Sequence, residues 1–178
     1  MNTIKVKDKR FRVSLPEAEI LEAVQRVADR INHDMEGKDP LFLSVLNGAF
    51  MFTADLMKRI TLASEIQFVK LASYQGMAST GEVKQLVGLN QSLEGRTVVI
   101  VEDIVDTGLS MKRLLETLAP LHPAEVHIAT LLLKPEKLKV PLDIAYAALE
   151  IPNDFIVGYG LDYDGYGRNL KDIYTVVE

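Results

Sequence analysis

The stretch from Val98 to Ser110, VVIVEDIVDTGLS, constrains the fold of this chain more than any other. Its first four residues are apolar and β-branched, which is typical of a strand covered on both faces. Glu102 and Asp103 follow where such a strand emerges, and residues 106–110 turn the chain into a helix predicted around 111–118. A buried strand that leads into a helix predicts an α/β fold with a parallel sheet.

The same stretch predicts a ligand site, because open α/β sheets bind ligands beyond the carboxyl ends of their strands. The first backbone N–H groups of a helix have no internal partner, and the helix dipole favours an anion there. Gly108 would let the backbone approach a phosphate, and Thr107 and Ser110 would add hydroxyl donors. The alternative is a plain helix cap by Asp106 or Thr107, which would leave the two preceding acids unexplained. A phosphorylated sugar would use both features, because its hydroxyls suit the acids and its phosphate suits the start of the helix.

The rest of the chain alternates between helical and strand patterns. Apolar residues recur at helical spacing from Ile20 to Ile31, after a helix start at Ser14, Pro16 and Glu17. A second helix is expected to reach about Ile60. Further strands are expected near residues 41–46, 65–72, 84–89, 126–133, 144–147 and 155–159, with 173–177 as an edge strand. This order favours a twisted parallel sheet with helices on both faces.

Composition narrows the class of protein. The 178 residues are 48% hydrophobic, enough for one domain with a full core, and no run of about 18 apolar residues could cross a membrane. Cysteine is absent and residues 1–10 are polar, which together favour a cytoplasmic location. The net charge of −5, without a lysine and arginine cluster, argues against a nucleic-acid partner. His122 and His127 lack a third plausible metal ligand and are expected to be structural or exposed.

Four companion motifs stand at predicted strand ends or in loops. They are Leu46-Asn47-Gly48-Ala49, Ser73-Tyr74 with the small polar residues up to Val83, Lys134 after an apolar run, and DFIVGYGLDY (154–163) followed by Arg168. Taken singly, they have ordinary interpretations: a tight connection, a hairpin loop, a surface lysine and a core aromatic residue. Their order and spacing together carry more information.

Residues 98–110 resemble the phosphoribosyl pyrophosphate signature of the type I phosphoribosyltransferases. The companion motifs make the chain, from about Pro40 to Arg168, similar to the hypoxanthine (hypoxanthine-guanine) phosphoribosyltransferases. The resemblance implies one domain over residues 1–178, with a central twisted parallel sheet flanked by helices. It also implies a small hood built from parts of the N-terminal region and about 140–178.

The resemblance further implies a role for each motif. The phosphoribosyl group would be bound by Glu102, Asp103, Asp106, Thr107, Gly108, Leu109 and Ser110. Pyrophosphate would be bound by Leu46, Asn47, Gly48 and Arg168, and a lid would contain Ser73 and Tyr74. Many relatives carry Lys or Arg where this chain has Asn47, and the family often has a cis peptide at the bond matching Leu46–Asn47. The purine would be bound by Lys134, Phe155, Ile156 and Asp162, and Mg²⁺ by Glu102, Asp103 and Asp162.

The implied reaction transfers the 5-phosphoribosyl group of phosphoribosyl pyrophosphate to N9 of hypoxanthine, with guanine as a second candidate. It would yield IMP or GMP and pyrophosphate, in purine salvage. Asp106 would be the general acid or base at purine N7, and the Lys134 ammonium, which has only donors, suits a 6-oxo group and rejects the amino group of adenine. The preference among hypoxanthine, guanine and xanthine stays open.

Other functions fit the sequence less well. A non-catalytic regulator of the same fold, which senses phosphoribosyl pyrophosphate, is the main alternative. In a receiver-type signalling domain the acidic pair would lie much farther before the lysine, and a nucleotide-binding oxidoreductase would need a G-x-G-x-x-G turn. Neither a nucleic acid nor a membrane is expected as a partner. A homodimer or homotetramer is expected, with the helix of residues 48–60 as a candidate interface.

Overall fold

The computed structural model describes residues 3–71 and 86–177 and contains two sheets. The larger sheet has the strand order β5-β4-β3-β6-β7-β8 and the smaller one β1-β2-β10-β9. The strands are β1 (Thr3–Val6), β2 (Lys9–Leu15), β3 (Leu41–Val45), β4 (Glu65–Leu71), β5 (Leu86–Val87), β6 (Thr97–Val105), β7 (Glu125–Leu133), β8 (Tyr146–Glu150), β9 (Ile156–Val157) and β10 (Ile173–Val176). The helices are α1 (Glu17–Asp34), α2 (Phe50–Met57) and α3 (Leu109–Leu118), with the 3₁₀ turns η1 (Ala119–Leu121) and η2 (Pro135–Lys137).

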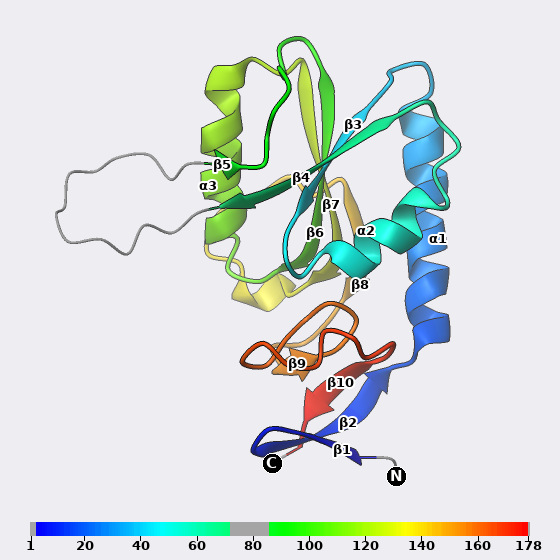
Figure 1. Cartoon of the computed structure of the whole chain (residues 1–178), viewed down its shortest axis with the longest axis vertical. Helices are drawn as coiled ribbons and strands as arrows, with labels where there is room; N and C mark the ends of the chain where they lie inside the picture. The colour runs from blue at the N-terminus through cyan, green and yellow to red at the C-terminus, as the bar shows by residue number, and fades with distance from the viewer. Residues whose placement is uncertain (1–2, 72–85, 178) are drawn as a thin grey trace, which may run out of the picture.

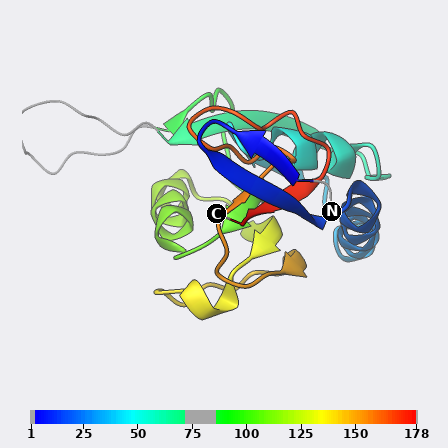
Figure 2. The ribbon, with the colours of Figure 1, turned by 90° about the horizontal axis from the view of Figure 1, so that it is seen from below.

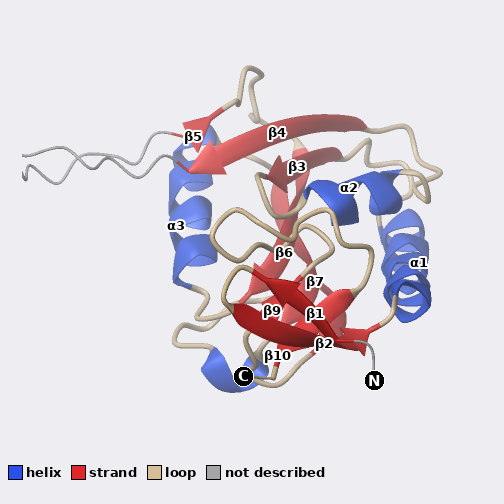
Figure 3. Ribbon diagram, turned by 60° about the horizontal axis from the view of Figure 1, so that its bottom comes forward, coloured by secondary structure: helices blue, strands red, loops and turns tan. Residues whose placement is uncertain are grey.

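The larger sheet is parallel from β4 to β8, and β5 joins its edge antiparallel to β4. Helices α1 and α2 cover one face, and α3 covers the other (Figures 1 and 3). Since both faces are covered, alternate residues of β6 enter different cores: Val99 and Val101 pack with α1, whereas Val98 and Ile100 pack with α3. The architecture confirms the α/β fold class.

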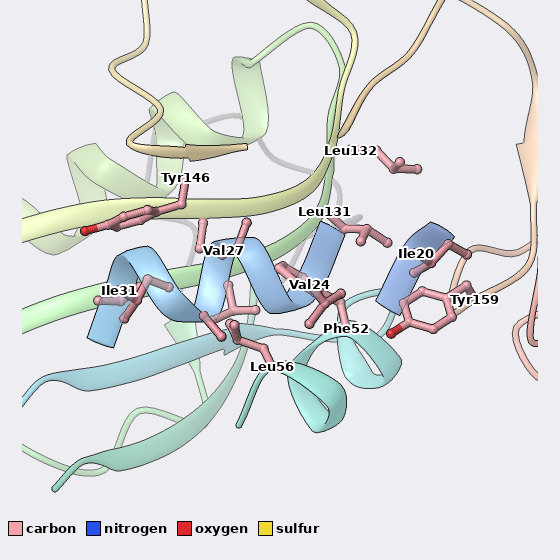
Figure 4. Packing of buried hydrophobic residues seen from close by; sticks show 14 of the residues in the cluster. Ile20, Val24, Val27, Ile31, Phe52, Leu56, Leu131, Leu132, Tyr146 and Tyr159 are labelled. Carbon is pink, nitrogen blue, oxygen red and sulfur yellow. The ribbon is translucent and has the colours of Figure 1, made fainter. Parts of the chain in front are cut away.

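The core under α1 follows from the spacing of its apolar residues. Ile20, Val24, Val27 and Ile31 recur every three or four positions and are buried, so they form one stripe of the helix. Figure 4 shows this stripe between α2, which supplies Phe52 and Leu56, and β7, which supplies Leu131 and Leu132. Burial of such side chains contributes roughly 1.5–3 kcal/mol each, so this layer holds the sheet and both helices together.

The smaller sheet lies near the carboxyl ends of the parallel strands, and it brings the two ends of the chain together (Figures 1 and 2). Its β1–β2 hairpin has no counterpart in the sequence-based expectations, because charged residues interrupt both strands. The expectation that 173–177 forms an edge strand is wrong. β10 pairs with β2 on one side and β9 on the other, which explains why Ile173 is fully buried.

Several expected boundaries also differ from the structure: β8, for example, is Tyr146–Glu150 rather than 144–147. β6 continues to Val105, so Glu102 and Asp103 lie inside the strand rather than beyond it. The reason is that pairing with β7 continues to the register Val105–Leu133. Helix α2 ends at Met57, shorter than expected. Within residues 3–71 and 86–177, no helix is long and apolar enough to cross a membrane.

Candidate functional site

A cavity of about 380 Å³ opens where β3 and β6 end. Its lining contains most of the predicted phosphoribosyl-binding side chains together with the start of the 46–49 turn: Val45, Leu46, Lys70, Leu71, Glu102, Asp103, Ile104, Val105, Asp106, Thr107, Gly108, Ser110 and Met111. Leu109 is not among these residues and is exposed at the first position of α3. The fold therefore joins two strand-to-helix connections, as the parallel arrangement requires.

The acidic pair is held by its own backbone. The Asp103 N–H donates to Glu102 Oε1 (3.1 Å), and the Ile104 N–H donates to Asp103 Oδ1 (2.8 Å). Burial raises the pKa of Glu102 well above its ordinary value of 4.5, and the adjacent carboxylate of Asp103 raises it further. Two crowded acids in a cavity favour a ligand that supplies hydroxyl donors or a cation.

Gly48 brings the second connection against this pair. An added Cβ at Gly48 would lie 1.7 Å from Asp103 Oδ2, so only glycine leaves room for the carboxylate. The neighbouring Leu46–Asn47 peptide bond is cis, as in the family that the sequence resembles. The predicted pyrophosphate loop and the predicted ribose-binding acids are thus in direct contact.

The loop from Asp106 to Ser110 enters α3 through Gly108, which has a left-handed φ of 82°. A Cβ at Gly108 would lie 2.9–3.2 Å from methyl groups of Leu138, Val140 and Leu142. Glycine is therefore required here for packing and for the turn, besides any approach to a phosphate. The Leu109 N–H donates to Thr107 Oγ1 (3.3 Å), so the Thr107 hydroxyl already helps to order the start of the helix.

The predicted purine-binding residues lie directly after β7, in β9 and in the loops on either side of β9. Lys134 is only 6% exposed, and its ammonium donates to the backbone carbonyl of Asp154 (2.7 Å). Burial lowers the pKa of Lys134, while the nearby carboxylates of Asp106 and Asp154 oppose that change. A buried ammonium with one carbonyl partner has donors left for another oxygen.

Phe155 is 44% exposed, an unusual exposure for a ring that has aromatic neighbours. It lies edge-on to Tyr163, with 5.5 Å between ring centroids, and 6.1 Å from Phe11 of β2. Ile156, the next residue, is buried in β9. The smaller sheet therefore fixes Phe155 while leaving part of the ring available to a flat ligand.

Arg168 and Asp162, predicted to bind different groups, pair with one another. The Arg168 guanidinium lies 2.9 Å from Asp162 Oδ1 and also donates to the Gly160 carbonyl (2.7 Å). The Gly165 N–H donates to Asp162 Oδ2 (2.7 Å), so both oxygens of this carboxylate have partners. In the part of the chain that the structure describes, no three acidic or histidine side chains form a metal-binding group. Mg²⁺ commonly binds one or two protein carboxylates together with oxygens of the substrate. Glu102 and Asp103 can supply these carboxylates.

Some functional features were missed in the sequence, and one predicted pair lies outside the described residues. Ser73 and Tyr74 belong to the segment that the structure leaves out. Lys137, 3.0 Å from Asp106 Oδ2, looked like an ordinary surface lysine, and only the turn signal of Pro135 hinted that it folds back. Gly160 was also overlooked: an added Cβ there would lie 2.1 Å from the Gly48 carbonyl oxygen.

Comparison with known proteins gives a consistent result. Residues 16–164 match the phosphoribosyl transferase domain. The chain is 44% identical over 141 residues to a hypoxanthine-guanine phosphoribosyltransferase of Mycobacterium avium, covering 79% of this chain and 70% of that protein. It is 39% identical over 168 residues to the Streptococcus pyogenes serotype M3 (strain ATCC BAA-595 / MGAS315) protein of the same name, covering 94% of this chain and 93% of that protein. Other curated relatives are longer bifunctional proteins, and this chain covers 25% of their length.

Solved structures agree with the sequence relatives. A hypoxanthine-guanine phosphoribosyltransferase from Bacillus anthracis superposes with a TM-score of 0.84 at 36% identity, covering 94% of this chain and 97% of that chain. The match therefore extends over nearly the whole of both chains.

Proposed function

Because this chain belongs to the phosphoribosyl transferase family, in its hypoxanthine-guanine phosphoribosyltransferase branch, we propose that it is a purine salvage enzyme. It transfers the 5-phosphoribosyl group of phosphoribosyl pyrophosphate to N9 of hypoxanthine, and to guanine as a second substrate. The observation that carries the proposal is the single cavity that Glu102 and Asp103 share with the loop from Asp106 to Ser110. One ligand that has both hydroxyls and a phosphate fits such a lining.

In this proposal the donor is held at three points. Backbone N–H groups at the start of α3 and the hydroxyls of Thr107 and Ser110 bind the 5′-phosphate. Glu102 and Asp103 bind the ribose hydroxyls. The 46–48 turn and Arg168 bind pyrophosphate, for which a guanidinium has a suitable shape.

Magnesium fits the donor set of this cavity. Glu102 and Asp103 would hold the ion together with oxygens of the donor, and Asp162 would be the third carboxylate that helps to hold it. When bound, the ion offsets the negative charge of the departing pyrophosphate.

The purine is held by the other side of the site. Lys134 donates to the 6-oxo group, Phe155 stacks on the ring, and the Ile156 backbone and Asp162 meet its edge. Cleavage of the glycosidic bond passes through an oxocarbenium-like state, and attack by N9 requires a change of protonation on the purine. As N9 bonds to the ribose carbon and pyrophosphate leaves, Asp106 accepts the proton that the purine releases at N7.

The remaining expectations stay predictions. Ser73 and Tyr74 as a lid, a cytoplasmic location and a homodimer or homotetramer belong to this group. Light scattering on the purified protein tests the last of them. The relatives named above are phosphoribosyltransferases, which gives the non-catalytic regulator no support.

Steady-state kinetics with Mg²⁺, phosphoribosyl pyrophosphate and each of four bases tests the proposal. Pyrophosphate release and nucleotide formation are expected with hypoxanthine and guanine, whereas adenine should be disfavoured by roughly 10⁴ in kcat/KM. Comparing kcat/KM for xanthine with the values for hypoxanthine and guanine shows which group the site prefers at the purine 2-position. Tight binding of phosphoribosyl pyrophosphate without turnover of any base would contradict the proposed enzymatic function and would favour the non-catalytic regulator.

A further inference from the structure

The segment that follows β7 lies along the loop that follows β6. We call residues 134–142 the strap. The Lys134 N–H donates to the Val105 carbonyl (3.0 Å), and the Lys139 N–H donates to the Thr107 carbonyl (2.9 Å). Between these two backbone bonds, the Lys137 ammonium lies 3.0 Å from Asp106 Oδ2. The last residue of β6 and the first two residues of the loop after it are therefore held by three positions of the strap.

Two of the three lysines of the strap, Lys134 and Lys137, have separate side-chain partners. Lys134 donates to the Asp154 carbonyl and so faces the smaller sheet. Lys137 is the one that pairs with Asp106, from the end of the 3₁₀ turn η2. The proposed purine-binding ammonium and the ammonium that contacts the proposed acid–base carboxylate are thus different groups, three residues apart.

The orientation of the Asp106 carboxylate is unusual. Its Oδ1 atom is buried, and within residues 3–71 and 86–177 no donor reaches it. A buried carboxylate oxygen without a donor is costly, so the carboxylate would gain by turning that oxygen toward water. The contact from Lys137 to Oδ2 opposes this rotation.

The same contact leaves Oδ2 usable. The pair is partly exposed, with 36% of the Lys137 side chain and 38% of the Asp106 side chain accessible. A carboxylate oxygen can accept more than one hydrogen bond, so Oδ2 can keep Lys137 and still meet a ligand in the cavity. A pair this exposed contributes little to stability, which leaves geometry as its main effect.

We propose that Lys137 is a positioning residue for Asp106, a role that rests on the proposed function. It fixes the accessible carboxylate oxygen toward the purine and keeps a cation beside it while the proton moves. Lys137 touches neither substrate in this proposal and acts only through Asp106. Its loss should therefore slow the chemical step without weakening the hold on phosphoribosyl pyrophosphate.

The first test compares three variants in steady-state kinetics with hypoxanthine. Lys137→Met keeps the length of the side chain and removes its charge, and kcat should fall about tenfold while the KM for phosphoribosyl pyrophosphate changes less than about twofold. Lys137→Arg restores the cation and should recover most of the lost kcat. Lys38→Met is the matched control, because Lys38 and Glu125 form an ion pair of the same 3.0 Å length and 40% exposure of each side chain. Its kcat should equal that of the unaltered protein.

The second test separates positioning from a general disturbance of the strap. In an Asp106→Asn background, adding Lys137→Met should lower kcat no further, because the group that Lys137 positions is already gone. A further loss of about tenfold in the double variant would mean that Lys137 acts independently of Asp106, and this overturns the proposal.

The tests also distinguish failure of this proposal from failure of the proposed function. An unaltered protein that binds phosphoribosyl pyrophosphate yet turns over no 6-oxopurine overturns both. An active protein whose kcat is unchanged by Lys137→Met overturns the role of Lys137 alone. A Lys137→Met variant that raises KM and leaves kcat intact overturns it as well, since that result belongs to a substrate-binding residue.

Discussion

Asp106 stands at the junction of the β6 loop and the strap, and its role in proton transfer can be tested by one isosteric change. Asp106→Asn keeps the shape of the side chain but removes the base. We expect kcat to fall by roughly 10²–10⁴, the usual value of a positioned acid or base. The affinity for phosphoribosyl pyrophosphate, measured by calorimetry, should change only a few fold, because the start of the helix that holds the phosphate is intact. A variant with normal kcat would remove Asp106 from the mechanism.

Lys134 is the residue expected to choose the base. Its buried ammonium has donors and no acceptor, so we expect it to discriminate against the adenine amino group. Lys134→Ala should lower the ratio of kcat/KM for hypoxanthine to kcat/KM for adenine by about 10² or more. The ratio is the appropriate measurement, because a partly unfolded fraction lowers both values equally. An unchanged ratio would refute this role even if total activity drops.

At this scale the sequence was informative where a residue type is rare in its setting. Two acids directly after an apolar run, as at Glu102 and Asp103, predict a site because the positions that follow such a run are normally apolar or turn residues. Lys137 gave no such signal, since lysine is common on surfaces. Its partner is 31 residues away, and that contact depends on how the strap folds back. The pairing between Arg168 and Asp162 could not be predicted either, because it depends on how the loop that carries both residues folds.

At the scale of the elements, the contact between the 158–161 loop and the 46–49 turn leads to a further prediction. Gly160 and Gly165 both have positive φ, 96° and 86°. An added Cβ meets the Gly48 carbonyl oxygen at 2.1 Å in the first case and nothing within 4 Å in the second. Alanine at either position therefore strains the backbone, by about 1–2 kcal/mol, but only Gly160→Ala also displaces the 46–49 turn.

We expect Gly160→Ala to weaken pyrophosphate binding at least about tenfold more than Gly165→Ala, measured by calorimetry on the two folded variants. Since the glycine-to-alanine change is the same in both, Gly165→Ala controls for the effect of φ. Equal affinities in the two variants would show that the contact with Gly48 does not position the turn.

Element predictions succeeded where hydrophobic periodicity was strong. The stripe of α1 and the apolar run of β6 were both anticipated, because burial on one or two faces leaves a clear pattern in the sequence. The β1–β2 hairpin was missed, since its charged residues face solvent and only Val6 and Phe11 of the two strands are buried. The position of β10 between β2 and β9 depends on pairing between the two ends of the chain, which local patterns do not specify.

For the molecule as a whole, the proposed site lies between two sheets and depends on their junction. Three of the hydrogen bonds at this junction are these: the Glu17 N–H at the start of α1 donates to Asp172, Lys134 donates to the Asp154 carbonyl, and the Tyr159 hydroxyl donates to Asp55 Oδ2. Only the second involves a residue of the proposed purine site. The other two can therefore be altered to test the junction without removing a substrate contact.

The contact between Tyr159 and Asp55 makes stability depend on pH. Burial alone would raise the pKa of Asp55, but hydrogen bonds from Lys58 and Tyr159 outweigh it and bring the pKa below the ordinary value of 3.8. A carboxyl whose pKa is lowered by folding contributes stability that is present above pH 3.8 and is lost as the pH falls through the lower, folded-state value. The contribution should therefore be complete near neutral pH and disappear in acid.

Asp55→Asn should reduce the free energy of unfolding by about 1.5–3 kcal/mol near neutral pH, the usual range for a hydrogen bond to a charged group. Urea unfolding at a series of pH values should show this difference shrinking below about pH 4, because the unaltered protein loses the contribution as Asp55 takes up a proton. Asp164→Asn is a suitable control, since Asp164 pairs with Lys7 at a site where 67% of its side chain is exposed, and such pairs contribute about 0–1 kcal/mol. A difference for Asp55→Asn that stays constant from neutral to acid pH would mean that the charge of Asp55 is irrelevant to the junction.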